Sequence, residues 1–127
     1  APSTILQRGA IAAVLAAVAN AAIVLGAGTA GVAPNFRALT VPPVLLLTIV
    51  GVAGATLVFW VLARRRAAPE ALFTRIAIAV LVVSLFPDVA LLGFDPAATV
   101  AGVLVLMVMH VVVAAVSVAA LTSRLGV

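Results

Sequence analysis

The sequence contains no cysteine and no lysine among its 127 residues. Without cysteine the chain cannot form a disulfide, a thiol redox centre, an S-palmitoyl anchor or a thiolate metal site. Without lysine it cannot hold retinal or pyridoxal phosphate as a Schiff base, because that linkage needs a lysine amine. These two absences exclude several classes of functional site before any motif is considered.

Charged residues are also scarce. They make up 8% of the chain, against about 25% in soluble proteins. Hydrophobic residues make up 67%, and the mean hydropathy is +1.46. This composition predicts an integral membrane protein with a single transmembrane domain over residues 1–127, surrounded by lipid. The net charge of +4 comes from arginines at the ends of apolar runs, so we expect no nucleic-acid partner.

Long apolar runs are the main feature of the chain, and a bilayer core needs about 20 such residues as a helix. The first run resembles a secretory signal peptide, but it is longer than the usual h-region of about 7 to 15 residues, so we expect it to be a span. The fold class is therefore all-α, an integral membrane four-helix bundle with up-down-up-down topology. The expected spans are residues 9–28, 44–63, 75–93 and 97–123.

The arginines predict the orientation in the membrane. Arg64, Arg65 and Arg66 come one helical turn after an aromatic pair near the end of the second span, and most other arginines fall on the same side, with Arg37 opposite. The positive-inside rule then places both termini in the cytoplasm, with the chain in the cell inner membrane. The triplet can also bind anionic lipid, although fixing the orientation is the simpler interpretation.

Small residues predict where helices pack. Thr48, Gly51 and Ala55 share one face of the second span, and the last two have the small-xxx-small spacing common in membrane helices. We expect this face to pack helix on helix, inside the bundle or between copies. The longest connection, residues 29–43, is the best candidate for contact with a partner outside the membrane.

Three polar side chains lie well inside the spans: Asn20, Asp88 and His110. Counted from the cytoplasmic arginines at about 1.5 Å per residue, they lie roughly 18 to 21 Å deep. In an up-down-up-down bundle the fourth helix contacts both the first and the third, which predicts His110 between Asn20 and Asp88. Asp88 is only five residues before Gly93, which argues for a position nearer the outer surface.

Ionisable groups inside a membrane are costly, so Asp88 and His110 are functional candidates. Three interpretations stay open: a hydrogen-bonded trio with Asn20 that fixes helix register, a proton-linked or solute-binding site, and ligation of a haem or pigment by His110. A bis-histidine haem would need a second histidine from another chain. We expect no metal site and no tightly bound cofactor.

Two stretches carry a family resemblance: residues 83–88, Val-Ser-Leu-Phe-Pro-Asp, and residues 106–111, Leu-Met-Val-Met-His-Val. With the arginine-rich turn at residues 62–66, they resemble a family of small four-span bacterial and archaeal membrane proteins of unknown function. The resemblance implies a four-helix membrane fold and implies no activity. The chain does not look like a small multidrug exporter, because the glutamate expected in the first span is missing.

The sequence alone favours a non-enzymatic membrane protein, because no nucleophile–base pair or metal-ligand cluster is visible. The leading interpretation is an accessory or scaffold subunit that packs against lipid and against other membrane subunits or itself. The alternative is a small carrier or binding protein for a lipophilic or protonated solute, centred on Asp88 and His110.

Overall fold

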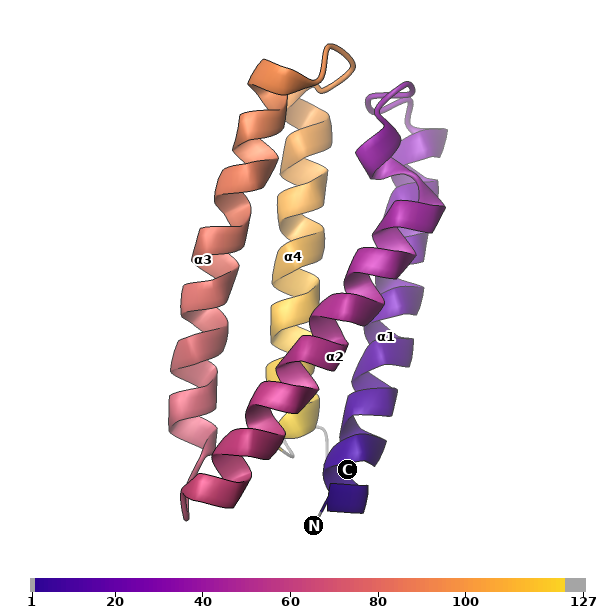
Figure 1. Ribbon diagram of the computed structural model, residues 1–127. Coiled ribbons are helices and arrows are strands. Elements are labelled where there is room, and N and C mark those ends of the chain that lie inside the picture. Colours follow the sequence, from indigo (N-terminus) through magenta and orange to yellow (C-terminus); the bar gives the residue numbers. More distant parts are fainter. Residues whose placement is uncertain (1, 123–127) are drawn as a thin grey trace.

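The computed structural model describes residues 2–122, which form four long helices and one short 3-10 helix (Figure 1). All four long helices are long and apolar enough to cross a membrane, and no strand occurs in this part of the chain. This confirms the all-helical class and the four apolar helices. Ser123 and Arg124, at the end of the fourth predicted span, lie outside the described residues. The elements are α1 (Pro2–Thr29), η1 (Arg37–Leu39), α2 (Val41–Arg65), α3 (Glu70–Phe94) and α4 (Val100–Leu121).

Consecutive helices run in opposite directions, so the start of α1 lies at the same end of the molecule as the turn between α2 and α3 (Figure 1). We call this the arginine end. The helix α1 packs against both α2 and α4, and α3 packs against α4. The arginines at this end are Arg8, Arg64, Arg65, Arg66 and Arg75.

The contact between α2 and α3 is concentrated near the arginine end. There the rings of Phe59 and Phe73 meet edge to face, with centroids 5.0 Å apart and planes at 80°, a favourable aromatic geometry. Away from this contact the two helices diverge (Figure 1). One side of the bundle is therefore less closely packed than the others.

A stripe of mostly small residues brings α1 close to its neighbours. Small side chains let helix backbones approach in lipid, where packing replaces the hydrophobic effect as the driving force. Ala12 and Ala16 are fully buried in a cluster with Val52 and Ala120. The buried stripe recurs every three or four residues and consists of Ile5, Gly9, Ala12, Ala16, Asn20, Val24 and Ala27.

The connection between α1 and α2 folds back onto the end of the bundle opposite the arginine end. Phe36 is only 1% exposed and shares a core cluster with Ala33, Leu39 and residues of α4. A Cβ atom at Gly102 of α4 would lie 2.8 Å from the Ala33 Cβ, so this approach depends on glycine. Three residues of the connection, Ala33, Phe36 and Leu39, are therefore core, while the others are exposed or half-buried, and contact with a partner outside the membrane stays a prediction.

The prediction that Gly51 packs helix on helix, inside the bundle or between copies, stays a prediction, because a single chain is described and shows only a loose contact at this residue. Within this chain it is exposed, and a Cβ atom there would meet only Val113 Cγ1, at an ordinary contact distance of 3.4 Å. The reason is the rotation of α2, which buries Thr48 and Val52 and leaves Gly51 beside that face. Ala55 does pack, against the cluster that contains Phe59 and Phe73.

The helices α1 and α2 approach closely at Gly9, where a Cβ atom would lie 2.5 Å from Thr56 Oγ1 and 3.2 Å from Thr56 Cβ. We expect Gly9→Val to lower the free energy of unfolding in detergent by about 1 to 3 kcal/mol, because it overpacks this contact. The matched control is Gly26→Val on the same helix, where nothing lies within 4 Å of the added atom. Equal stability of the two variants would contradict the packing of α1 on α2.

Candidate binding site

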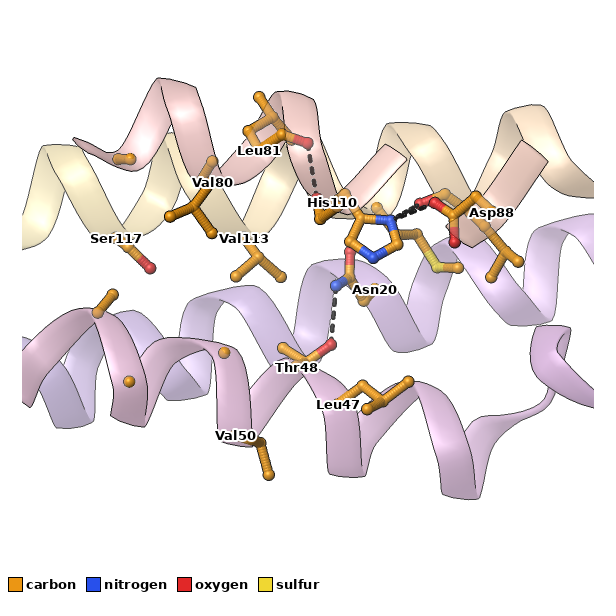
Figure 2. A pocket seen from close by; sticks show the side chains of 18 of the residues that line it. Asn20, Leu47, Thr48, Val50, Val80, Leu81, Asp88, His110, Val113 and Ser117 are labelled. Carbon is orange, nitrogen blue, oxygen red and sulfur yellow. Dashed lines mark hydrogen bonds and ion pairs between the residues drawn. The ribbon is translucent and has the colours of Figure 1, made fainter. Parts of the chain in front are cut away.

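Asp88 of α3 and His110 of α4 meet inside the bundle (Figure 2). His110 Nδ1 lies 2.7 Å from Asp88 Oδ2 and 2.9 Å from the carbonyl oxygen of Leu106. Because both neighbours are acceptors, Nδ1 carries a hydrogen, which it donates to the Leu106 carbonyl while the Asp88 carboxylate lies at ion-pair distance. His110 Nε2 has no hydrogen-bond partner among residues 2–122.

A second polar pair joins α1 to α2. Asn20 Nδ2 donates a hydrogen bond of 2.9 Å to Thr48 Oγ1, and both residues are almost fully buried. The other amide atom, Asn20 Oδ1, has no partner within the described residues, and neither has the hydroxyl of Ser117 on α4. Buried polar atoms are nearly always partnered in native proteins. Two buried, unpartnered oxygens in one small bundle are therefore a feature that needs an explanation.

Both pairs line one cavity of about 540 Å³, bounded mainly by α2, α3 and α4. This volume falls in the range of roughly 300 to 1,000 Å³ that is usual for small-molecule sites. Most of the wall is aliphatic. The polar residues that line it are Asn20, Thr48, Ser84, Asp88, His110 and Ser117.

The cavity opens sideways, between the diverging helices α2 and α3. Leu47 and Val50 of α2 and Val80 of α3 belong to its lining, yet they are 66%, 57% and 61% exposed. Phe59 and Phe73 pack together toward the arginine end, and Ala38 of η1 lines the cavity toward the opposite end. In a bilayer the opening would therefore face the acyl chains of the lipid.

Local sequence explains how these side chains reach the cavity. Pro87, the residue before Asp88, has no backbone N–H. The carbonyl of Val83 therefore lacks the hydrogen bond that it would receive in a regular helix. On α4, Leu106, His110 and Ser117 follow at spacings of four and seven, which places them on one side of the helix. The carbonyl of Leu106 and the hydroxyl of Ser117 therefore lie on the same side of α4 as the His110 imidazole.

The structure brings two of the three predicted polar residues into direct contact, Asp88 and His110. Asn20 lines the same cavity but bonds to Thr48, and no hydrogen bond joins the two pairs within residues 2–122. Sequence reasoning assigned Thr48 only to a packing face, because nothing in the sequence pairs it with Asn20. The position of Ser117 could have been predicted, because it lies two helical turns after His110 and therefore on the same side of α4.

The arginine triplet is separate from this cavity. Arg64, Arg65 and Arg66 are exposed at the end of α2, and the Arg64 guanidinium carbon lies 4.9 Å from the centroid of the Trp60 ring. Such stacking over an indole is a cation–π contact. The described residues contain no group of three histidine, cysteine, aspartate or glutamate side chains placed to hold a metal ion.

The contact between Asp88 and His110 predicts energetic coupling. We expect the double variant Asp88→Asn with His110→Gln to lose less stability than the sum of the two single variants, by about 0.5 to 3 kcal/mol, because either single change already breaks the contact. Unfolding in detergent measures the cycle. Asp95→Asn combined with His110→Gln is the control, since the Asp95 side chain accepts a hydrogen bond from the Ala97 backbone N–H in the α3–α4 loop. If the stability changes were additive in both cycles, Asp88 and His110 would not be energetically coupled.

Comparison with known proteins gives a family without an assigned activity. No curated protein and no solved structure matches the sequence. A family model described as a family of unknown function, DUF6069, matches residues 1–127 and so includes the alanine-rich first helix, which the sequence resemblance did not use. The cavity and its polar residues therefore have to be interpreted from their own chemistry. The chain belongs to the family of unknown function DUF6069.

Proposed function

We propose that this chain is a non-enzymatic membrane protein that binds a lipophilic small molecule in the cavity between α2, α3 and α4. The proposal rests on one observation: Asn20 Oδ1 and the Ser117 hydroxyl are buried without partners beside an apolar cavity. Leaving such a group unsatisfied costs about 1 to 3 kcal/mol. A ligand with a polar head group that hydrogen-bonds to one of these atoms would recover part of that cost.

The shape and lining of the cavity support a ligand that arrives from the bilayer. Small-molecule sites are mostly apolar and have a few polar groups that converge on one region. Here the apolar wall continues into the exposed side chains of Leu47 and Val80 at the lateral opening. An apolar body would lie along this wall, with its polar group near His110 and Asn20.

A second candidate is the accessory or scaffold subunit predicted from the sequence. The observation that favours it is the exposure of α3, which buries only Phe73 and Asp88 against the rest of the chain. Its remaining surface is free to pack against a helix of another subunit or of a second copy. Native purification would show a larger complex in this case, and a small bound molecule in the first.

A haem or pigment at His110 is a special case of the binding proposal. His110 lines the cavity, and its Nε2 has no hydrogen-bond partner among the described residues; a neutral imidazole ligates a metal centre through such a nitrogen. The chain has a single histidine, so a second axial histidine would come from another chain. An absorption spectrum of the purified protein would identify a pigment directly, and we expect none.

We propose further that the protein lies in the cytoplasmic membrane of a bacterium or archaeon with the arginine end facing the cytoplasm. The positive-inside rule supports this orientation, because Arg37 is the one arginine in the described residues at the opposite end. Arg64, Arg65 and Arg66 would then contact lipid phosphates, while Trp60 lies at the level of the head groups.

This orientation predicts which loops react with an impermeant thiol reagent in intact cells. Because the native chain has no cysteine, single replacements report without background. Asn35→Cys, in the connection between α1 and α2, should be labelled. Ala68→Cys, in the turn between α2 and α3, should react only after the cells are opened. Labelling of residue 68 in intact cells would show that the orientation is opposite to the one proposed.

The binding proposal predicts that a larger side chain at Gly51 fills the cavity. Radiolabelled decanol is a suitable probe, because it joins an apolar chain to a single polar group. In lipid nanodiscs Gly51→Leu should weaken the binding of decanol about tenfold or more, equivalent to about 1.4 kcal/mol. The variant should fold as stably as the native chain. Gly26→Leu, on an open face of α1, is the control. Unchanged binding by Gly51→Leu would place the ligand elsewhere, and no binding to the native chain would contradict the proposal.

A further inference from the structure

The polar atoms that the cavity offers to a ligand are mostly acceptors. Asn20 donates one of its two amide hydrogens to Thr48, and its Oδ1 is an acceptor without a partner among the described residues. His110 Nε2 can accept a hydrogen bond whenever the imidazole is neutral, because the hydrogen is then on Nδ1, next to two acceptors. The carboxylate of Asp88 can only accept when it is ionised. A ligand head group that donates hydrogen bonds therefore fits Asn20 Oδ1, His110 Nε2 and the Asp88 carboxylate.

The cavity also lacks a positive charge. Asp88 is the one acidic residue in its lining, and no arginine lines it. The other polar side chains that line the cavity are Asn20 from α1, Thr48 from α2, Ser84 from α3 and Ser117 from α4, and none of these titrates. Asp88 and His110 are thus the only ionisable groups at the site, and an ionised carboxylate there has no cation unless His110 is protonated.

Resting on the proposed binding function, we infer that the ligand is a lipophilic amine in its protonated form, and that it binds in exchange for one proton held by Asp88 and His110. An isolated charge in a membrane interior is unfavourable. A proton on the imidazole neutralises the carboxylate in the empty site, and an ammonium group neutralises it in the occupied site. Either positive charge is enough to neutralise the carboxylate, so the site holds the proton or the ammonium group and not both.

The two states exclude each other at one atom. In the protonated site the imidazolium carries its second hydrogen on Nε2, so that atom cannot accept. When the amine binds, this hydrogen leaves to solvent as a proton, and an N–H of the ammonium group donates to the freed lone pair. One proton leaves for each cation that enters, and no covalent bond to carbon changes. Binding of the cation and binding of the proton are therefore negatively linked.

The inference is tested with the full chain in lipid nanodiscs, using decylamine and decanol as matched probes. An alkylamine of this kind is protonated at neutral pH, as a lysine side chain is. We expect decylamine to bind at least about tenfold more tightly than decanol above the pH at which the pair loses its proton. Below that pH its affinity should fall by about tenfold per pH unit, because one proton competes with it.

Calorimetry in two buffers of different ionisation enthalpy measures the number of protons released on binding. Near the pH at which the pair loses its proton, we expect about one proton released per decylamine bound and none for decanol. Asp88→Asn should abolish both the preference for the amine and the proton release while decanol still binds, and Asp95→Asn in the α3–α4 loop should change neither. Empty nanodiscs give the background.

The outcomes separate the two proposals. Equal binding of both probes to the native chain, or binding of decylamine without proton release, would overturn the amine inference and leave the binding function standing. Failure of both probes to bind would overturn both. The comparison on the native chain needs no variant, so it decides the question even if Asp88→Asn does not fold.

Discussion

The contact between Asp88 and His110 is the interaction on which the position of α3 depends. The helix α3 buries only two side chains, Phe73 near one end and Asp88 nearer the other. Lipid provides no water to satisfy a carboxylate or an imidazole, so these groups find each other across the interface between α3 and α4. Two fixed points, one aromatic and one polar, then set both the rotation of α3 and its depth.

The remaining helices pack by a different means. The helices α1, α2 and α4 approach closely through Gly9, Ala12 and Ala16, where small side chains replace the usual interlocking of large ones. Because α1 holds α2 on one side and α4 on another, α2 is drawn away from α3 beyond the contact of Phe59 with Phe73. The cavity is the consequence of this unequal packing (Figures 1 and 2).

This arrangement bears on the choice between a structural and a binding role for the polar residues. A hydrogen-bonded trio that merely fixed helix register would satisfy its own members. Instead Asn20 Oδ1 and the Ser117 hydroxyl lack partners in the described chain, and both residues line the same cavity as His110. Unsatisfied buried groups reduce stability, so their place in the lining of one cavity supports a ligand that completes the network.

The sequence by itself determined the helical class, the four apolar helices and the rarity of polar residues within them, because composition and span length are local properties of the chain. It also singled out Asn20, Asp88 and His110, since any polar group in an apolar run stands out. Only the tertiary structure decided that Asn20 bonds to Thr48 and that Gly51 borders a cavity. Those facts depend on the rotation and separation of helices, which several weak contacts set together and which no periodicity in one segment encodes.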